Sequence, residues 1–456
     1  MRKRMAVILA AGKGTRMKSK LYKVLHPILG LSMIEHVMRA VEGSQVDQIV
    51  TIVGHGAEAV QGLLGDRSDY AIQAEQLGTG HAVLQAKNLM DKQVGSCLVI
   101  CGDTPLLTAE TLEALFDYHE AEDAKATILT AQVDNPKGYG RVIRQADGHV
   151  SHIVEDKDAN SEEKQVKEIN TGTYIFDNQL LFELLGQVKN DNAQGEYYLP
   201  DVIGLLKERG EKILAHVMEH PEEAIGVNDR VALAEAGRLM RNRINRHHLM
   251  NGVTLVDPLS TYIEADVQIA SDTLLEAGVS LKGKTVIGQD CFIGAHSEIV
   301  DSVLADQVLV RQSVIENSQI GKGSDVGPFA HLRPNSQLGQ SVHIGNFVEV
   351  KNSVIGDNTK SGHLTYIGDA KLGQGINIGC GTIFVNYDGK HKHQTIVGDN
   401  SFIGCDTKLM SPLTLGKEVV TAAGSTITDD IPDQGLGIAR QRQTTIPNYY
   451  PKFINK

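Results

Sequence analysis

The feature that most constrains the fold of this chain is a six-residue rhythm in its second half, in which an aliphatic residue is followed by glycine. This spacing fits short strands that each place one aliphatic side chain in a narrow core, with glycine at the corner that follows. A generic glycine-rich β-sandwich has no reason to keep such a register for so long. The rhythm therefore predicts a stacked parallel β-helix of the hexapeptide type from about residue 251. The pairs are Ile287-Gly288, Ile293-Gly294, Ile320-Gly321, Val326-Gly327, Leu338-Gly339, Ile344-Gly345, Ile355-Gly356, Ile367-Gly368, Leu372-Gly373, Ile378-Gly379, Val397-Gly398, Ile403-Gly404 and Leu415-Gly416.

One polar segment, residues 385–395, interrupts this rhythm. Its residues cannot fill an aliphatic core, so we expect the segment to loop outward, as insertions in solenoids do, often on a binding face. Lys390 and Lys392 could meet a phosphate there, although a merely solvated loop would have the same composition.

The first half has a different pattern, in which short apolar runs alternate with stretches of helical period. Such alternation predicts a mostly parallel sheet covered by helices, with ligands at the carboxyl ends of the strands. The expected strands are 5–9, 48–53, 97–101 and 126–129, and the expected helices are 32–41, 57–64 and 108–119.

A glycine-rich turn, residues 9–17, directly follows the first of these strands. Gly12 and Gly14 allow a sharp bend that brings backbone N–H groups close to a ligand, and Lys13 and Arg16 add charge-assisted bonds to phosphate oxygens. The spacing is neither that of a Walker A loop nor that of a dinucleotide fingerprint. By itself the turn could be an ordinary βα connection, but in this setting it indicates a nucleotide enzyme.

Length and composition bound the remaining possibilities. A chain of 456 residues exceeds one ordinary core, and we expect three parts: a nucleotide domain at 1–229, a helical linker at 230–250 and the β-helix at 251–456. A net charge of −12 disfavours a general nucleic-acid or anionic-membrane surface. The five cysteines are scattered and form no C-x-x-C pair, which favours the reducing cytoplasm. The sequence has no apolar run long enough to span a bilayer, which favours a soluble protein.

Beyond this general chemistry, an ordered set of motifs resembles the bacterial bifunctional N-acetylglucosamine-1-phosphate uridyltransferase/glucosamine-1-phosphate acetyltransferase family over nearly the whole chain. The motifs are residues 9–17, 23–26, 76–82, 102–105, 138–141, 168–172, 192–198, 226–230, 327–334, 345–351, 362–369 and 386–389. The resemblance implies acetyl transfer from acetyl-CoA to glucosamine 1-phosphate, followed by uridylyl transfer from UTP with release of pyrophosphate. It also implies a Rossmann-like α/β first domain, a left-handed coil in the second, and three chains packed into a homotrimer.

The resemblance assigns a nucleotide site to the first domain. It gives Arg16 and Lys23 the catalytic cations, with Lys23 on the α-phosphate, and Asp103 and Asn228 the binding of Mg²⁺, for which Mn²⁺ could substitute. Tyr22, just before Lys23, departs from the proline of many relatives. The residues expected to hold UTP and the sugar are Leu9, Ala10, Ala11, Gly12, Lys23, Gln73, Gly78, Thr79, Gly140, Glu155, Asn170 and Asn228.

The resemblance assigns a second site to the β-helix. Because only the neutral amine attacks a thioester, the reaction needs a base, and His363 takes this role with Glu349 orienting or polarising it. The residues expected to hold the sugar phosphate are Arg333, Lys351, Tyr366, Asn377, Asn386, Tyr387 and Lys392. The residues expected to contact acetyl-CoA are Cys380, Cys405, Ala423 and Arg440.

Two other functions compete with this interpretation. One is a sugar-nucleotide pyrophosphorylase whose β-helix only oligomerises or regulates, and the other is a solenoid scaffold with a nucleotide-sensing head. An acetyl-CoA assay separates the first from a bifunctional enzyme, and release of pyrophosphate separates the second.

Overall fold

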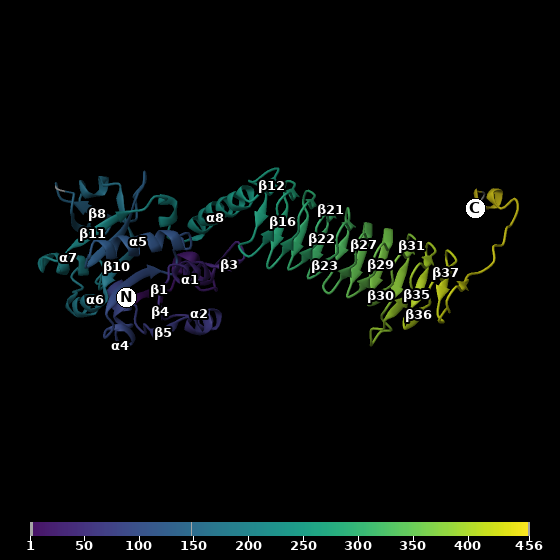
Figure 1. Ribbon diagram of the computed structural model, residues 1–456, viewed down its shortest axis with the longest axis horizontal. Helices are drawn as coiled ribbons and strands as arrows, with labels where there is room; N and C mark the ends of the chain where they lie inside the picture. The colour runs from purple at the N-terminus through teal and green to yellow at the C-terminus, as the bar shows by residue number, and fades with distance from the viewer. Residues whose placement is uncertain (1–2, 147, 455–456) are drawn as a thin grey trace. The chain divides into compact units, whose positions relative to one another are not determined.

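The computed structural model describes residues 3–146 and 148–454, and it divides into two compact units, Met1–Met240 and Arg241–Lys456 (Figure 1). The helix α8 (Arg230–Met250) contains the division between them. Among the described residues, none of the helices combines the length and the apolar composition needed to cross a bilayer.

The first unit is a sheet with helices packed against it, in the strand order β11-β7-β10-β6-β1-β4-β5, with β8 and β9 attached beside β10. The strands are β1 (Lys3–Ala10), β2 (Pro27–Ile28), β3 (Leu31–Ser32), β4 (Gln48–Val53), β5 (Asp69–Ile72), β6 (Gly95–Cys101), β7 (Ala126–Gln132), β8 (Gly140–Arg144), β9 (Val150–Val154), β10 (Glu168–Asp177) and β11 (Ile213–Val217). The helices are α1 (Met33–Gly43), α2 (Ala57–Leu64), α3 (Thr79–Leu84), α4 (Lys87–Met90), α5 (Ala109–Ala121), α6 (Asn178–Leu184) and α7 (Asp201–Glu208).

All four expected strands and all three expected helices of this unit are present, with ends shifted by a few residues. Ser32 caps helix α1, because its hydroxyl accepts from the backbone N–H of Glu35 at 3.3 Å. The sheet is mixed, because β10 runs antiparallel to both β6 and β7. The sequence pattern missed β10, although the motif at residues 168–172 lies on it.

The second unit is a coil of short parallel strands, as the six-residue rhythm predicts (Figure 1). Two ladders, one through β12, β15 and β18 and one through β13, β16 and β19, are joined by the long strands β27 and β29, and a separate sheet forms the third face. Those two long strands run from His343 to Lys351 and from Lys360 to Gly368.

The other strands of the coil are short. They are β12 (Thr254–Leu255), β13 (Tyr262–Ile263), β14 (Gln268–Ile269), β15 (Leu274–Leu275), β16 (Ser280–Lys282), β17 (Val286–Ile287), β18 (Phe292–Ile293), β19 (Glu298–Val300), β20 (Val303–Leu304), β21 (Leu309–Val310), β22 (Val314–Glu316), β23 (Gln319–Ile320), β24 (Asp325–Val326), β25 (His331–Leu332), β26 (Gln337–Leu338), β28 (Val354–Ile355), β30 (Ala370–Leu372), β31 (Asn377–Ile378), β32 (Ile383–Val385), β33 (Thr395–Val397), β34 (Phe402–Ile403), β35 (Lys408–Met410), β36 (Leu413–Leu415), β37 (Val420–Thr421), β38 (Thr426–Ile427) and β39 (Leu436–Gly437). A short helix, α9 (Tyr450–Ile454), follows them.

The aliphatic residues of the rhythm form a continuous buried column inside this coil. Ile320, Leu338 and Ile355, for example, are register partners on successive coils and are 3%, 5% and 1% exposed. The glycines that follow the aliphatic residues are needed because neighbouring coils approach closely. A Cβ on Gly356 would lie 2.6 Å from the backbone carbon of Gly373 on the next coil.

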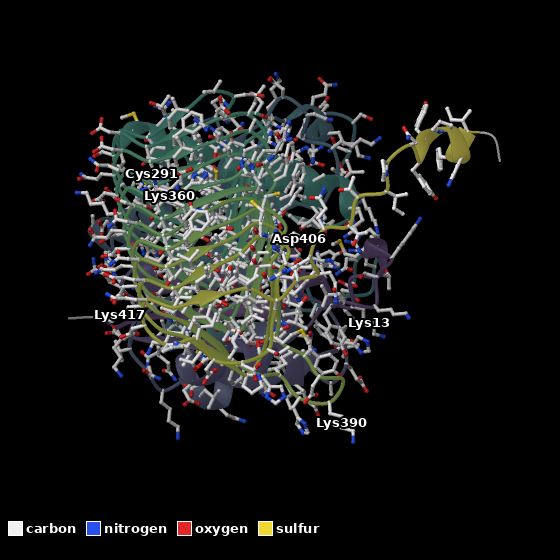
Figure 2. All side chains as sticks on the ribbon, turned by 90° about the vertical axis from the view of Figure 1, so that its right-hand side faces the viewer. Lys13, Cys291, Lys360, Lys390, Asp406 and Lys417 are labelled. Carbon is white, nitrogen blue, oxygen red and sulfur yellow. The ribbon has the colours of Figure 1, made fainter. Side chains whose placement is uncertain are left out.

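The polar segment after β32 leaves the coil, as expected. Figure 2 shows Lys390 at the tip of a loop outside the coiled ribbon. The Asp388 carboxylate shapes this loop by accepting from the backbone N–H groups of Lys390 and His391, each at 2.7 Å, and from the His393 ring at 2.7 Å. These bonds lower the pKa of Asp388 to about 2, and the bond from the backbone N–H of His391 contributes most.

Candidate active sites

A cavity of about 230 Å³ opens at the carboxyl ends of β1 and β6 in the first unit. Its walls contain most of the residues expected to hold a nucleotide: Leu9, Ala10, Ala11, Gly12, Lys23, Gln73, Gly78, Thr79 and Asp103. Five further lining residues were not singled out as site residues: Val24, Gln76, Ala82, Cys101 and Glu196. All five could have been found from the sequence, because each lies in one of the motifs or directly next to one.

Four polar groups from distant parts of the sequence meet at one edge of this cavity. The Lys23 ammonium pairs with the Asp103 carboxylate and donates to Asn228 Oδ1 at 2.7 Å. Arg16 donates to the same Asn228 oxygen at 2.9 Å. The backbone adds a further link, because the Val227 N–H donates to the Asp103 carbonyl at 2.8 Å. The two cations and two oxygen ligands expected from the sequence therefore form one cluster.

The oxygens of this cluster suit a hard divalent cation. The Asp103 carboxylate and the Asn228 amide oxygen already face a positive group, the Lys23 ammonium. Among the described residues, no group of three or more His, Cys, Asp or Glu side chains could hold a metal. Two protein ligands are nevertheless enough for Mg²⁺, which keeps several waters and shares substrate phosphates.

The side of the cavity that is expected to hold the base is built from two chain segments that hydrogen-bond to each other. The Gly80 N–H donates to the Tyr197 carbonyl at 2.8 Å, and the Leu199 N–H donates to Thr79 Oγ1 at 3.0 Å. Gly78 has a φ of +114°, and a Cβ there would lie 2.6 Å from the Tyr197 oxygen, so only glycine fits. Gln73 is 4% exposed, with its amide nitrogen 3.2 Å from the Gly78 oxygen, which leaves its carbonyl oxygen to accept from a ligand.

The residues expected to hold the sugar form a second group beside the cavity. Gly140 and Asn170 are antiparallel partners on β8 and β10, and a Cβ on Gly140 would lie 3.3 Å from Glu155 Oε1. Burial raises the pKa of Glu155, and the nearby carboxylates of Asp158, Asp156 and Asp201 raise it further. Burial also raises the pKa of the Cys101 thiol to about 12, so this thiol is neutral and not a nucleophile.

In the second unit, the register of the long strands gathers most residues expected for acetyl transfer. Glu349 on β27 is the register partner of Tyr366 on β29, and Asn346 is the partner of His363. The Asn346 amide oxygen lies 2.8 Å from His363 Nδ1. Because an amide oxygen can only accept, Nδ1 carries the proton and Nε2 keeps a lone pair. The sequence pattern did not point to Asn346, and only the stacking of the two strands reveals it.

Glu349 has a different partner from the one the resemblance implies. Its carboxylate accepts from Arg333 Nη1 at 2.8 Å, and both side chains are 39% exposed. The hydrogen bond that orients the His363 ring comes from Asn346 instead. Glu349 therefore fixes the guanidinium of Arg333, a cation expected to meet the sugar phosphate.

Two more cations and a polar network complete this region. Lys351 lies beside Lys392 of the protruding loop, and the Lys392 side chain lowers the pKa of Lys351, through a hydrogen bond and its charge. Asn386 Nδ2 donates to Asp369 Oδ2 at 2.5 Å and to the Tyr366 hydroxyl at 3.4 Å. Two close positive charges need an anion beside them, and a phosphate would supply it.

The remaining expected residues are more dispersed. Asn377 is exposed on β31, where it is the register partner of Lys360 and Phe402. Tyr387 is 56% exposed, and its hydroxyl donates to the Gly389 carbonyl at 2.7 Å.

The residues expected to contact acetyl-CoA form a column along one corner of the coil. Cys380 and Cys405 occupy matching positions on adjacent coils, because Ile378 is the register partner of Ile403. Ala423 continues the column, since the Gly424 N–H donates to the Cys405 carbonyl at 2.8 Å. Arg440 is exposed just after β39.

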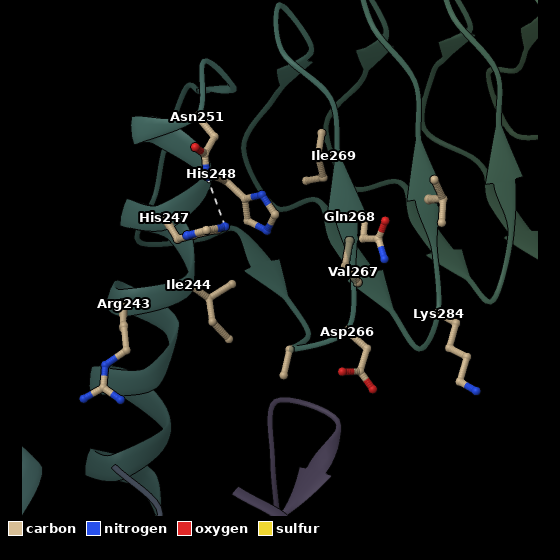
Figure 3. Close-up of a pocket in the computed structure, with 12 residues that line it drawn as sticks. Arg243, Ile244, His247, His248, Asn251, Asp266, Val267, Gln268, Ile269 and Lys284 are labelled. Atoms are coloured by element: carbon tan, nitrogen blue, oxygen red, sulfur yellow. Dashed lines mark hydrogen bonds between the residues drawn. The ribbon is translucent and has the colours of Figure 1, made fainter. Parts of the chain in front are cut away.

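A larger cavity, of about 860 Å³, lies in the second unit between α8 and the first coils (Figure 3). It is lined by Arg243, Ile244, His247, His248, Asn251, Ala265, Asp266, Val267, Gln268, Ile269, Lys284 and Val286. None of the residues expected for either reaction belongs to this set. Size alone therefore does not identify the reactive sites of this protein.

Comparison with known proteins identifies the family. A family model described as nucleotidyl transferase matches residues 5–221, a GMPPB C-terminal domain model matches 263–360, and a model of the hexapeptide repeat of succinyl-transferase matches 394–429. The bifunctional protein GlmU of Enterococcus faecalis is 60% identical over 453 residues, which are 99% of each chain. Those of Exiguobacterium sibiricum (58% identical, 97% of this chain and 99% of the relative) and Bacillus velezensis (55% identical, 100% of both) are also similar. The chain belongs to the family of bifunctional GlmU proteins.

Proposed function

We propose that this chain makes UDP-N-acetylglucosamine in two steps, in two separate sites. Residues 251–456 acetylate glucosamine 1-phosphate with acetyl-CoA, and residues 1–229 then transfer UMP from UTP to the N-acetylglucosamine 1-phosphate. The observation that carries the proposal is the meeting of Arg16, Lys23, Asp103 and Asn228 at the cavity of the first unit, in a chain whose second unit pairs Asn346 with His363 and Glu349 with Arg333.

In the uridylyl step, an oxygen of the sugar phosphate attacks the α-phosphorus of UTP, the bond to the β-phosphate oxygen breaks, and pyrophosphate leaves. The protein positions the reactants and neutralises the growing negative charge. Lys23 supplies charge at the α-phosphate, and Arg16 supplies charge along the triphosphate. Gln73 and Gly78 hold the uracil, and Glu155 and Asn170 hold sugar hydroxyls.

Asp103 and Asn228 would hold Mg²⁺, with Mn²⁺ as a possible substitute. When bound, the ion would neutralise charge on the phosphates. The fit rests on the two oxygens that already face a cation in this structure. Asp103 and Asn228 are far apart in the sequence, so their role as a pair depends on the folded sheet.

In the acetyl step, the amine of glucosamine 1-phosphate attacks the thioester carbonyl. A C–N bond forms, the C–S bond breaks, and Nε2 of His363 takes the amine proton. This proton then goes to the departing sulfur, so that coenzyme A leaves as the thiol. Asn346 holds the ring in the tautomer that this step needs. Arg333, Lys351 and Lys392 bind the phosphate, with Tyr366, Asn377, Asn386 and Tyr387 around the sugar, while Cys380, Cys405, Ala423 and Arg440 contact the coenzyme.

A homotrimer built on the β-helix belongs to the same proposal. Its support is an exposed apolar ladder next to His363: Phe329 and Phe347 stack with ring centroids 5.4 Å apart, and Leu364 follows on the next coil. These three side chains are 50%, 54% and 59% exposed, which is unusual for large apolar residues in a row and typical of an interface. We place the enzyme in the cytoplasm, where its free cysteines stay reduced.

Two variants test whether the sites are separate. We expect His363→Ala to abolish release of free coenzyme A thiol and to leave pyrophosphate release from UTP and N-acetylglucosamine 1-phosphate unchanged. We expect Asp103→Ala to do the opposite. If either variant loses both activities, the two-site proposal fails, and if the unaltered protein never releases the thiol, it is a pyrophosphorylase with a structural coil.

A further inference from the structure

Tyr22, the residue directly before Lys23, is anchored on a neighbouring loop of the first unit. Its ring meets the His55 ring edge-on, with centroids 5.4 Å apart and planes at 89°. The same ring covers Gly56, which has a φ of +83° and where a Cβ would overlap the Tyr22 ring atoms. Both partners belong to the connection between β4 and α2, so the ring links two loops at the carboxyl edge of the sheet.

Tyr22 is the first partly buried residue after an exposed stretch of the chain. The four residues before Tyr22, from Lys18 to Leu21, are all exposed. Tyr22 is half-buried, and its carbonyl accepts from the Leu25 N–H at 3.0 Å, which closes the one-turn helix Lys23–Leu25. The ring therefore fixes the first residue of the turn that carries Lys23.

This one-turn helix fixes the position of the Lys23 backbone, from which the side chain extends. Gly14 has a φ of +60°, and a Cβ there would lie 2.5 Å from Lys23 Cβ, so the stem of Lys23 packs against the glycine-rich loop. From that stem the ammonium reaches Asp103 and Asn228. A lysine held at both its stem and its tip has little freedom to choose another position.

We propose that Tyr22 is a positioning residue for uridylyl transfer, whose ring, docked on His55 and Gly56, holds Lys23 at the α-phosphate. This inference rests on the function proposed above for Lys23. The ring acts through packing, so phenylalanine should serve equally well. Because a displacement of about 1 Å can cost on the order of 10²-fold in rate, loss of the ring should be visible mainly in kcat.

The test compares Tyr22→Ala and Tyr22→Phe in the full chain. We expect Tyr22→Ala to lower kcat for pyrophosphate release by about 10²-fold, with a smaller change in KM for UTP, and Tyr22→Phe to retain the wild-type kcat. The matched control is Tyr118→Ala, which removes a half-buried tyrosine packed on a histidine of the same unit, His216, at 5.1 Å. The control should leave kcat unchanged, and the circular dichroism spectrum and melting curve of each variant report whether the protein is folded.

A double-mutant cycle separates positioning from a general structural effect. In a Lys23→Ala background, adding Tyr22→Ala should cause no further fall in rate, since Tyr22 acts through Lys23. An equal fall in both backgrounds, a kcat within twofold of wild type for Tyr22→Ala, or a Tyr22→Phe variant as slow as Tyr22→Ala would each overturn the proposal.

A readout that does not depend on activity keeps this result distinct from a failure of the proposed function. Trypsin cuts after lysine, and Val24, which follows Lys23, is buried. We expect Tyr22→Ala to make the Lys23–Val24 bond cleavable under native conditions. In wild type, Tyr22→Phe and Tyr118→Ala this bond should stay intact, and cleavage near it should be confined to the exposed run before Tyr22. Unchanged cleavage in Tyr22→Ala would refute the anchoring, and absence of pyrophosphate release from wild type would refute the function instead.

Discussion

Replacing Phe384 tests whether the β-helix can be destabilised, with loss of acetyl transfer, while uridylyl transfer in the first unit is unaffected. This side chain lies on β32, is 0% exposed and is the register partner of Leu409 on the next coil. Phe384→Ala would remove a buried ring from a narrow column that cannot easily collapse, at a cost of about 3–5 kcal/mol. For a unit of this size, 1 kcal/mol shifts the midpoint by about 2–4 °C, so we expect a decrease of about 6–20 °C.

The assay is thermal inactivation of the two activities in one preparation, together with a melting curve. Acetyl transfer should be lost at the lower temperature, while uridylyl transfer keeps its wild-type profile, because the residues around Phe384 carry only the acetyl site. Phe402→Ala, which removes a 49% exposed ring from the same coil, should change the melting midpoint by much less. A shift below about 2 °C for Phe384→Ala, or equal inactivation of both activities, would refute the reasoning.

Three further predictions concern the two sites. Burial raises the pKa of Glu155, so its carboxylate takes up a proton at a higher pH than an ordinary glutamate does. As the pH falls, KM for N-acetylglucosamine 1-phosphate should therefore rise, while KM for UTP should not. Glu155→Gln should remove this dependence, and its persistence would exclude Glu155 as the cause. Because Lys392 lowers the pKa of Lys351, KM for glucosamine 1-phosphate in wild type should rise toward alkaline pH earlier than in Lys392→Ala, and coincident pH profiles would contradict this. Chelation of divalent ions should stop pyrophosphate release and leave acetyl transfer unchanged, with added Mg²⁺ restoring the first activity; acetyl transfer that falls in parallel would argue against a metal confined to Asp103 and Asn228.

Much of the fold could be predicted because it repeats. The spacing of Ile320, Leu338 and Ile355 depends only on local periodicity, and the coil that buries them follows directly. Four strands of the first unit, β1, β4, β6 and β7, and three of its helices, α1, α2 and α5, were also found from short apolar runs and helical periods. Strand β10 was missed because a polar motif, with Asn170 and Thr171 at its centre, hides its apolar alternation, and both residues are buried by neighbouring strands.

The site residues divide in the same way. The residues of the glycine-rich turn were readable because the turn is continuous in sequence. Neither the Arg333–Glu349 pair nor the bond from Asn346 to His363 could be found from spacing, because each joins residues one coil apart, 16 or 17 positions along the chain. The contact of Tyr22 with His55 and Gly56 joins separate loops and leaves no pattern in the sequence at all.

Hydrophobic periodicity and glycine placement are local properties of the chain, so they were enough to predict a nucleotide-binding α/β part and a β-helix. The sequence also carried enough ordered motifs to indicate the family. Which polar groups meet depends instead on the folded chain: Lys23 with Asp103 and Asn228, Asn346 with His363, and Arg333 with Glu349. Charge and hydrogen bonding act over a few ångströms in space, and folding brings together groups as distant in the sequence as Arg16 and Asn228, which are 212 positions apart.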